Sequence, residues 1–577
     1  MKKLFFLIVV IIPLAVYAQQ KPAQNDDLTG LRAVGSPANP KVPMRWNHYN
    51  DYAGITKFCQ DMAKAHPNLV KIESMGKTFQ GRDLWVLVVS DFKTGNAERK
   101  PGFYIDGNIH SNELQGSEIA MYTAWYLAEN FGTVDFTTQL LKDKVFYIAP
   151  SINLDAREDF IKNPNNPNSP RSGMMPFDDD GDGEIDEDKY DDLDGDGNIV
   201  LMRRKTPLGR MKQDPNDPTR MIPAKADEPG EYEMLGYEGI DNDGDGQVNE
   251  DLAGRYDPNR DWAWNWQPDY VQNGALFYPG TLPETQAVKK FILSHPNIAG
   301  AQSYHNYGGM FLRGPGAEED QQYYNPSDVA VYDIIGRTGE KIIPGYNYFV
   351  IYKDLYTVYG GEIDWLALGR GVFTFSTELM TPYLLFRQKQ TQNDDFNQFG
   401  KYLLFDDAYV AWKPFKHPQY GDIEIGGPKK NYIRNHPGFM LEEDAHRNMS
   451  FTLFHAYQTP KLDVQSITTK PLGNGLTEVT ATVVNQRVIP TRSSHDIKYK
   501  IERPDYITLK GAAPLAAMVV ENADLNLTRE QKYNPATVEV PNIPGMGYVQ
   551  VRWIVKGSGK YTVSVDSRKG GLVEKTL

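Results

Sequence analysis

Two histidines and one glutamate occupy positions in the sequence where they could bind a metal ion. His110 and Glu113 follow an apolar run at 103–105 and precede a helical pattern, and His305 ends a second strand-like run. An imidazole and a carboxylate three residues apart can point to one spot, and two histidines with one glutamate leave a coordination position open, as in catalytic zinc sites. The alternatives are a helix-capping role for Glu113 and a hydrogen-bonded place in the core for His305.

Three aspartate-rich loops form a second kind of candidate metal site. In each loop aspartates alternate with other residues, and a glycine follows the third aspartate. Alternate carboxylates on a tight turn offer the hard oxygen ligands that Ca²⁺ prefers, and the glycine permits the bend. The twelfth loop positions are not glutamate, so the EF-hand pattern fails, and the alternative is a disordered acidic loop.

We nevertheless predict two or three structural calcium ions in these loops, which would share carboxylates from nearby residues. The predicted ligands are Asp178, Asp180 and Asp182 in the first loop, Asp192, Asp194 and Asp196 in the second, and Asp241, Asp243 and Asp245 in the third, with Glu187, Asp188, Glu250 and Asp251 as candidates to complete the ligand shells.

Short apolar runs alternate with helical patterns from about residue 46 to 410. Buried strands interleaved with helices favour an α/β fold in which helices cover both faces of a sheet, and such sheets place their ligands at the carboxyl ends of strands. The predicted strands are 84–89, 103–105, 145–149 and 372–375, and the predicted helices are 112–130 and 283–294.

The residue composition and the hydrophobic pattern change several times along the chain. After about residue 460, apolar and polar residues alternate in short runs separated by turns, a pattern typical of a β-sandwich. We predict a signal peptide at 1–18, an extended segment at 19–45, an α/β domain at 46–415 with an acidic loop insertion at about 156–256, a connecting region at 416–459 and a C-terminal β-sandwich at 460–577.

The composition limits location and partners. The chain has 577 residues, with 61 Lys and Arg against 75 Asp and Glu, and its single cysteine, Cys59, excludes an intrachain disulfide. A net charge of -14 argues against binding nucleic acid through bulk charge. Lys2 and Lys3 precede an apolar run at 4–16, and small residues lead to a cleavage position after Ala18. This pattern predicts a signal peptide and a secreted or periplasmic protein without an integral membrane segment after cleavage.

The sequence resembles the zinc carboxypeptidase family of secreted metallopeptidases over roughly residues 46–410. Five of the family's motifs occur in order, and five motifs in register are a far stronger signal than any one of them. They are the Gly-Arg-Asp triplet at 81–83, the HxxE motif at 110–113, the strand and turn at 148–155, the strand that ends in Tyr304 and His305, and the strand that carries Glu378.

The resemblance implies a mixed sheet flanked by helices and a zinc-dependent carboxypeptidase. The enzyme would hydrolyse the C-terminal bond of peptides or proteins that have a free C-terminus, through a zinc-activated water. In this interpretation His110, Glu113 and His305 bind one zinc ion, and Glu378 is the general base.

Further site residues follow only from the resemblance. The run at 202–206 is similar to the segment with the family's oxyanion arginine, which implies Arg204, with Arg203 as the competing residue. The run at 256–262 is similar to the segment whose Asn-Arg pair binds the substrate carboxylate. The remaining implied residues are Asn259 and Arg260 for that carboxylate, Tyr356 (with Tyr359 as its competitor) as the mobile tyrosine, and Ile363 as the residue that sets a preference for apolar or aromatic C-terminal residues.

Two other functions remain open from the sequence. One is an amidase or endopeptidase that acts on cell-wall peptides with the same fold. The other is a calcium-dependent binding protein with a vestigial site. The sequence does not indicate a partner for the β-sandwich.

Overall fold

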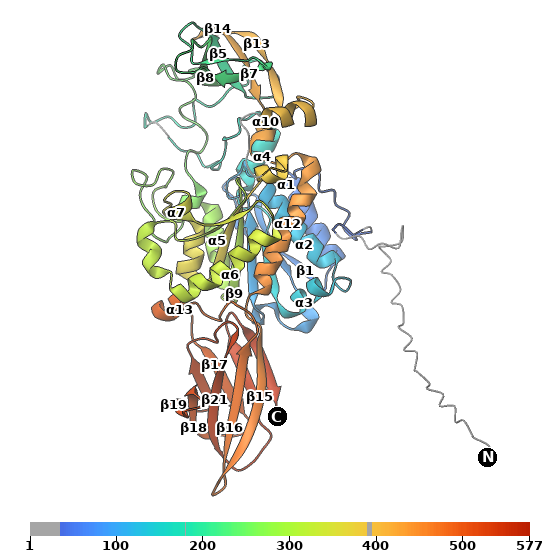
Figure 1. Ribbon diagram of the computed structural model, residues 1–577, viewed down its shortest axis with the longest axis vertical. Helices are drawn as coiled ribbons and strands as arrows, with labels where there is room; N and C mark the ends of the chain where they lie inside the picture. Colours follow the sequence, from blue (N-terminus) through green and yellow to red (C-terminus); the bar gives the residue numbers. More distant parts are fainter. Residues whose placement is uncertain (1–34, 38, 179–180, 389–394) are drawn as a thin grey trace, which may run out of the picture.

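The computed structural model describes residues 35–37, 39–178, 181–388 and 395–577. The described chain has three parts stacked along its long axis, namely a small antiparallel sheet, a central α/β body and a C-terminal pair of sheets (Figure 1). The predicted signal peptide at 1–18 and the predicted calcium ligand Asp180 lie outside the described residues.

A mixed sheet of eight strands forms the centre of the α/β body, in the order β1-β2-β4-β3-β9-β12-β10-β11. The four middle strands β4, β3, β9 and β12 run parallel to one another. Their side chains are almost all buried, as expected for parallel strands covered on both faces. The bounds are β1 Val70–Lys77, β2 Asp83–Val89, β3 Gly102–Gly107, β4 Val145–Ala149, β9 Ile298–Asn306, β10 Met310–Arg313, β11 Asn347–Val350 and β12 Phe373–Leu379.

Helices cover both faces of this sheet, which confirms the predicted α/β fold. On one face, helices α1, α2, α3 and α12 share a hydrophobic core with strands β2, β3 and β4. On the other face, α5 packs with the opposite side chains of the same strands. The bounds are α1 Tyr52–Ala65, α2 Gln115–Glu129, α3 Asp135–Asp143, α4 Leu154–Lys162, α5 Pro283–Ser294, α6 Pro326–Ile342, α7 Ile351–Asp354, α8 Glu362–Asp364, α9 Pro382–Phe386, α10 Asp395–Gln398, α11 Lys430–Ile433 and α12 Gly438–Tyr457.

Helix α1 shows how the local sequence builds one of these faces. Asp51 caps the helix by accepting a hydrogen bond of 2.8 Å from the backbone N–H of Gly54. Ile55, Phe58 and Met62 recur at helical spacing and are buried against the sheet. Each apolar side chain fully buried in this way contributes about 1.5–3 kcal/mol to folding.

The small sheet has six strands in the order β13-β14-β5-β8-β6-β7, and it corrects the predicted connecting region at 416–459. Strand β14 pairs with β5 of the insertion, and helix α12 packs on α2 in the α/β body, so the region belongs to both parts. No local pattern indicated this, because the partner strands lie about two hundred residues earlier in the chain. The bounds are β5 Leu201–Lys205, β6 Met211–Asp214, β7 Asp217–Pro223, β8 Tyr232–Tyr237, β13 Tyr409–His417 and β14 Gly421–Pro428.

The C-terminal part consists of two antiparallel sheets that form the predicted β-sandwich. Their orders are β15-β16-β21-β18-β19 and β20-β17-β22-β23, and alternate side chains such as Val479, Ala481 and Val483 fill the core between them. The bounds are β15 Leu462–Gly473, β16 Leu476–Asn485, β17 Asp505–Lys510, β18 Pro514–Asn522, β19 Leu527–Glu530, β20 Thr537–Val540, β21 Gly547–Lys556, β22 Thr562–Ser567 and β23 Gly571–Thr576, with a short helix α13 at Ser494–Tyr499.

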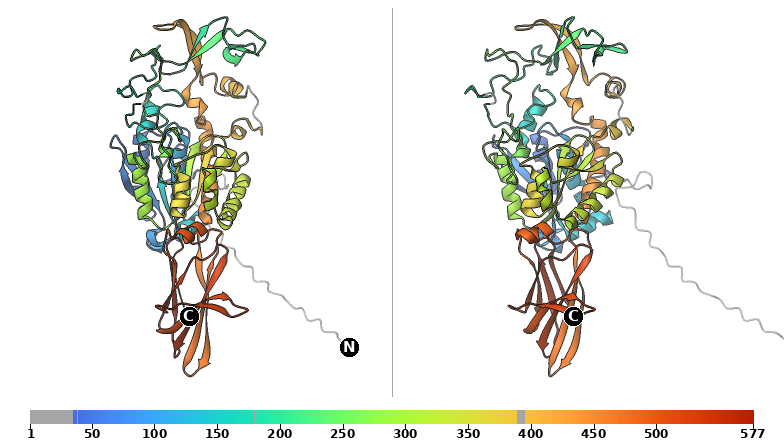
Figure 2. Two further views of the ribbon diagram at one scale, coloured as in Figure 1. Left: turned by 90° about the vertical axis from the view of Figure 1, so that its left-hand side faces the viewer. Right: turned by 60° about the vertical axis from the view of Figure 1, so that its left-hand side comes forward.

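Buried lysines join the sandwich to the α/β body, which lies directly above it in both views of Figure 2. The ammonium group of Lys569 donates hydrogen bonds of 2.8 and 2.7 Å to the backbone oxygens of Arg370 and Gly371. Lys144 donates a bond of 3.0 Å to the backbone oxygen of Thr459 at the start of the sandwich. Because a buried ammonium is costly without such partners, these contacts favour one fixed arrangement of the two parts.

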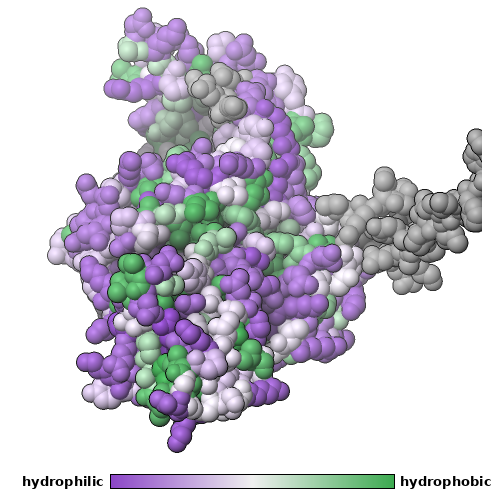
Figure 3. Space-filling model, turned by 60° about the horizontal axis from the view of Figure 1, so that its bottom comes forward, coloured by the Kyte–Doolittle hydropathy of each residue, from purple (hydrophilic) through white to green (hydrophobic). Residues whose placement is uncertain are grey.

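The surface carries no broad apolar area on the face shown in Figure 3, where hydrophobic residues form small separate patches among hydrophilic ones. None of the helices in the described ranges combines the length and the hydropathy needed to span a bilayer.

Candidate active site

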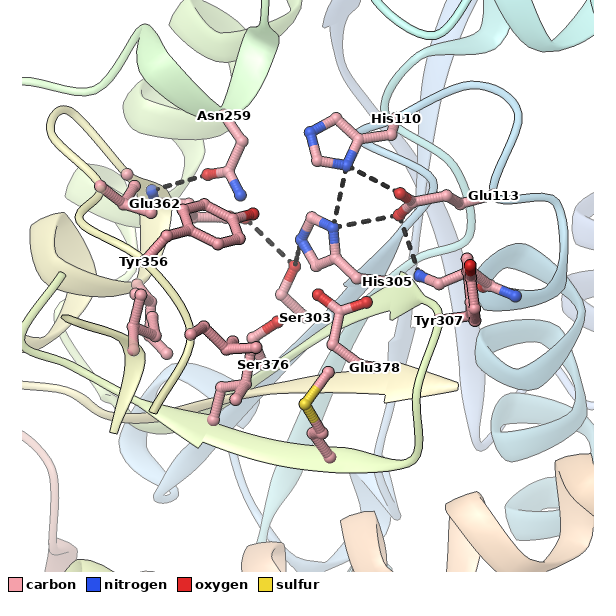
Figure 4. Close-up of a pocket in the computed structure, with 18 of the residues that line it drawn as sticks. His110, Glu113, Asn259, Ser303, His305, Tyr307, Tyr356, Glu362, Ser376 and Glu378 are labelled. Carbon is pink, nitrogen blue, oxygen red and sulfur yellow. Dashed lines mark hydrogen bonds and ion pairs between the residues drawn. The ribbon is translucent and has the colours of Figure 1, made fainter. Parts of the chain in front are cut away.

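His110, Glu113 and His305 come together at the carboxyl ends of the middle strands. His110 and Glu113 lie in the turn between β3 and α2, and His305 lies near the end of β9. The Nδ1 atom of His110 is 3.1 Å from Oε1 of Glu113, and the Nδ1 atom of His305 is 3.1 Å from Oε2 of Glu113 and 3.2 Å from Nδ1 of His110 (Figure 4). The side chain of Asn108 fixes the turn by donating hydrogen bonds of 2.8 Å to the backbone oxygens of His110 and Ser111.

These spacings fit a zinc ion. Ligand atoms about 2.0–2.1 Å from a tetrahedral metal are separated by roughly 3.3 Å, close to the separations found here. The two Nδ1 atoms face each other at 3.2 Å, so a lone pair on each could be directed at one metal ion. All three residues are at most 4% exposed, so the donor set is enclosed by its surroundings.

Asp257 fixes the orientation of the first histidine and was not predicted from the sequence. Its Oδ1 atom accepts a hydrogen bond of 2.9 Å from Nε2 of His110, which leaves Nδ1 free to bind a metal. Burial acts to raise the pKa of Asp257, but Arg260, Arg171 and His110 hold it well below its usual range. The carboxyl group is therefore ionised and can hold the imidazole of His110 with its Nδ1 atom toward the candidate metal position.

Glu378 lies in the same cavity of about 410 Å³ as the three candidate ligands. It is carried by β12, where it stands opposite His305 in the parallel pairing with β9. Burial is the largest influence and raises the pKa of this carboxyl group to about 7, although His305 acts to lower it. A carboxylate with a pKa in this range is suited to both accept and release a proton during turnover.

Asn259 and Arg260 line the cavity, and Asn259 lies on the side away from Tyr307 (Figure 4). They form a short turn, in which the carboxylate of Asp257 accepts a hydrogen bond of 2.8 Å from the backbone N–H of Asn259. The Oδ1 atom of Asn259 accepts a bond of 2.9 Å from the backbone N–H of Glu362, so the turn is tied to the opposite loop. Arg260 is 7% exposed, and its guanidinium provides a positive charge for an anionic ligand in the cavity.

The loop that faces this turn contributes Tyr356 and Ile363 to the cavity. Tyr356 is 58% exposed, whereas Ile363 is buried in a small apolar cluster with Leu312 and Ile351. The competing tyrosine, Tyr359, is not among the lining residues of this cavity. The structure therefore brings Tyr356, and not Tyr359, to the candidate site.

Arg204 and Arg203 do not reach the cavity, which corrects the predicted oxyanion residue. Both lie on β5 of the small sheet. Arg204 is partly exposed and pairs with Glu233 at 2.7 Å. Arg203 is stacked 4.1 Å from the ring centres of both Tyr232 and Trp412. The run at 202–206 is similar to the family segment in its residue types only. It forms strand β5, which pairs with β14 and β8 in the small sheet and not with the strands that carry the candidate ligands.

Two other arginines line the cavity, Arg171 and Arg434. The Nη2 atom of Arg171 is 3.1 Å from Nδ1 of His110, and its Nη1 atom donates a bond of 2.8 Å to Asp257. Burial acts to lower the pKa of Arg171, but Asp257 and Glu113 raise it, so the guanidinium is charged. Arg171 lies in a turn-rich segment without hydrophobic periodicity. Apart from the presence of an arginine, nothing in the local sequence indicates a functional residue there.

The aspartate-rich loops share one turn geometry. In each loop the first aspartate accepts a hydrogen bond from the backbone N–H of the glycine five residues later, with Asp192 and Gly197 as an example at 2.9 Å. The first and third loops lie side by side, because Asp186 donates a backbone bond to Asp251 and Asn249 donates one to Asp188, at 3.1 and 2.7 Å.

Several carboxylates of these loops converge on common points. The convergent sets are Asp182, Glu187 and Asp243; Asp192, Asp194 and Glu238; and Asp241, Asp243 and Asp245, in each of which the oxygens lie within 4.8 Å of one another. The predicted ligands Asp178 and Asp196 are not members of these sets. Asp194 and Asp196 also lie 2.8 and 3.2 Å from the ammonium group of Lys413.

Buried oxygens of Asp186, Glu187 and Glu250 have no hydrogen-bond partner in the described residues.

The arrangement of the candidate ligands, Glu378 and the cationic cavity wall is that of a metal-dependent peptidase. Residues 55–165 and 236–397 match the family model described as zinc carboxypeptidase, and residues 461–577 match a domain of unknown function, DUF8731. The α/β body of this chain belongs to the zinc carboxypeptidase family.

The chain is also similar to individual relatives and to a solved structure over part of their lengths. Carboxypeptidase D from Homo sapiens is 30% identical over 131 residues, which cover 23% of this chain and 9% of that protein. Carboxypeptidase B from Astacus astacus is 31% identical over 112 residues, which cover 19% of this chain and 35% of that protein. The crystal structure of the carboxypeptidase A from Helicoverpa armigera has 15% sequence identity and a TM-score of 0.43, and the similarity covers 72% of this chain and 74% of that chain.

Proposed function

We propose that this protein is a zinc carboxypeptidase that removes the C-terminal residue of peptides. One observation carries the proposal. A cavity of about 410 Å³ contains the half-buried Glu378, the buried Arg260, and ligand atoms from three side chains that lie 3.1–3.2 Å from their neighbours in the cluster. A metal site beside a proton acceptor can hydrolyse a peptide bond, and a buried cation in the same cavity favours a substrate with a free carboxylate.

Each residue has a separate task in this proposal. His110, Glu113 and His305 hold the zinc ion, which when bound supplies Lewis acidity for the scissile carbonyl and for water. The carboxylate of Glu378 accepts a proton from the attacking water and delivers it to the nitrogen of the leaving residue. The guanidinium of Arg171 donates hydrogen bonds to the developing oxyanion.

The part of the cavity beyond the candidate metal site recognises the C-terminal residue of the substrate. Asn259 and Arg260 bind the terminal carboxylate, and Tyr356 covers the bound residue from the rim. Ile363, with Leu312 and Ile351, gives this part of the cavity an apolar surface. We therefore expect a preference for apolar or aromatic C-terminal residues.

A comparison of two forms of one peptide tests the proposed function. We expect the zinc-loaded mature protein to remove residues stepwise from a peptide that ends in phenylalanine, and to leave its C-terminally amidated form intact. Mass spectrometry follows the products, and a zinc chelator should stop the reaction. Internal cleavage of both forms would show an endopeptidase instead, and cleavage of neither form across varied sequences would favour a binding protein with a vestigial site.

We also propose that the aspartate-rich loops bind Ca²⁺ and that the protein acts outside the cytoplasm. The convergent carboxylates and the buried, unpartnered oxygens of Asp186, Glu187 and Glu250 support the calcium proposal, since such groups are costly unless a cation or a donor compensates them. The signal-peptide pattern at 1–18 supports an extracytoplasmic location, where a chain with only one cysteine, the buried Cys59, needs cross-links other than disulfides.

Calcium should stabilise the folded chain measurably. We expect addition of Ca²⁺ to calcium-depleted, zinc-loaded protein to raise the midpoint of thermal unfolding, because a ligand at a hundred times its dissociation constant adds about 2.7 kcal/mol of stability. Asp182→Asn should weaken this response, whereas Asp61→Asn on the exposed side of α1 should not. An equal response to Mg²⁺, or no response to Ca²⁺, would exclude specific calcium sites.

A further inference from the structure

We propose that Arg434 is a specificity-determining residue that binds an acidic side chain on the residue preceding the scissile bond. This inference rests on the proposed carboxypeptidase function and deepens it. Arg434 lines the same cavity as Glu378 and the candidate zinc ligands. It lies outside residues 55–165 and 236–397, the ranges matched by the zinc carboxypeptidase model, so this chain adds it from a different segment.

The segment that carries Arg434 is built into the site. The backbone oxygen of Arg434 accepts a hydrogen bond of 2.8 Å from the side chain of Asn306, which directly follows His305. The side chain of the next residue, Asn435, accepts a bond of 2.9 Å from the backbone N–H of Leu114 and donates one of 2.9 Å to the backbone oxygen of Asn112. Asn435 is thus hydrogen-bonded to the residues before and after Glu113 in the sequence, so the backbone of Arg434 is held beside the candidate ligands.

One edge of the Arg434 guanidinium, formed by Nε and Nη2, donates hydrogen bonds to the side chain of Asn168. Its Nη2 and Nε atoms lie 2.9 and 3.2 Å from Oδ1 of Asn168, and its central carbon lies 5.9 Å from the ring centre of Tyr307. Asn168 belongs to the same turn as Arg171, whose backbone N–H donates to the backbone oxygen of Asn168 at 3.1 Å. One turn therefore places the two arginines together.

The two arginines differ in their charge partners. Arg171 is paired with Asp257 at 2.8 Å. Within the described residues, Arg434 makes no ion pair with a carboxylate, and its Nη1 atom makes no hydrogen bond. A charged guanidinium that is partly buried and has an open edge favours a carboxylate from the substrate, which it can bind with charge-assisted hydrogen bonds.

The position of Arg434 fixes which part of the substrate it meets. In Figure 4, Asn259 and Tyr356 lie on one side of the candidate zinc ligands, and Tyr307 lies on the other. A peptide whose terminal carboxylate is held at Asn259 and Arg260 has its scissile bond beside Glu378, so its preceding residue extends toward Tyr307. Arg434 is adjacent to that ring. The geometry therefore indicates that Arg434 contacts the side chain of the substrate residue that precedes the scissile bond.

Two matched substrates test the assignment. The N-acylated dipeptides acyl-Glu-Phe and acyl-Gln-Phe have nearly the same shape but differ by one charge. We expect wild-type enzyme to prefer acyl-Glu-Phe by about tenfold in kcat/KM, the effect of one charged hydrogen bond of about 1.5 kcal/mol. Arg434→Gln should reduce the ratio to about one through KM, with a smaller loss for acyl-Gln-Phe, and Arg434→Lys should retain part of the preference.

Arg387→Gln is the matched control, because Arg387 is an exposed arginine that pairs with Glu443 away from the cavity. It should leave the substrate ratio unchanged, and added salt should lower the ratio in wild-type enzyme but not in Arg434→Gln. A ratio of about one in wild-type enzyme, or a preference that survives Arg434→Gln, would overturn the proposal.

Binding measurements separate this proposal from the proposed function. The dissociation constants of both dipeptides can be measured by calorimetry on zinc-loaded Glu378→Gln protein, with and without Arg434→Gln. Tighter binding of acyl-Glu-Phe that is lost with Arg434 supports the assignment even if neither dipeptide is hydrolysed by wild-type protein. Equal dissociation constants contradict the role of Arg434, whatever the outcome for turnover.

Discussion

Glu378→Gln should lower kcat by about a thousandfold and leave zinc bound. The substitution keeps the size of the side chain but removes the group that accepts the proton of water, and general acid–base catalysis typically contributes a factor of about 10²–10⁴. Glu378 is not one of the three convergent candidate ligands, so the zinc content of the protein should stay at its wild-type value. Steady-state kinetics of the hydrolysis of an N-acylated dipeptide that ends in phenylalanine gives kcat, and elemental analysis gives the zinc content.

The matched control is Glu443→Gln, which changes an exposed glutamate on α12 that pairs with Arg387 and Arg447. Surface pairs of this kind contribute little to stability, so this variant should keep wild-type activity. Substantial turnover by Glu378→Gln with full zinc content would remove Glu378 from the mechanism. Loss of zinc together with activity would instead make it a structural support of the metal site.

Arg171→Gln should lower kcat by about 10²–10³, the usual cost of removing one donor to an oxyanion. KM should change little, because the oxyanion forms only after the substrate is bound. Arg171 also bonds Asp257, which orients His110, so the zinc content must be measured on the same preparation. Full zinc content with low kcat separates an effect on the transition state from an effect on metal binding.

Arg204→Gln is the natural control, because the sequence alone favoured that arginine for the same task. Its guanidinium is partly exposed and paired with Glu233 on the small sheet, so this variant should retain wild-type kcat. The opposite pattern, with low activity in Arg204→Gln and normal activity in Arg171→Gln, would assign the oxyanion to Arg204 and contradict the role of Arg171.

The residues that could be predicted are those fixed by local sequence. His110 and Glu113 are three residues apart at the end of a buried strand, and Glu378 lies in an apolar strand, so each pattern indicates both an element and a position within it. The α/β fold followed by a β-sandwich was predictable for the same reason, since period-two and helical patterns are local properties. The structure brings these candidate residues into one cavity.

The residues that were missed depend on contacts between distant segments. Asp257 matters because it meets His110, which is 147 positions away in the sequence, and Arg434 because Asn435 meets Asn112 across 323 positions. Arg171 lies in a turn-rich run that has no periodicity to place it. Arg204 was misassigned because its neighbours resemble a family segment, while the pairing of β5 with β14 that decides its location is not visible locally.

The pairing of β5 with β14 also orders the events of folding. Arg203 and Glu424 are hydrogen-bonded although they are 221 residues apart, so the small sheet cannot be completed until nearly three-quarters of the chain is available. Long-range pairing of this kind slows folding. The chain that leaves β14 continues into Arg434, which lines the cavity. The residues that form the cavity are therefore not all available until most of the chain has been synthesised.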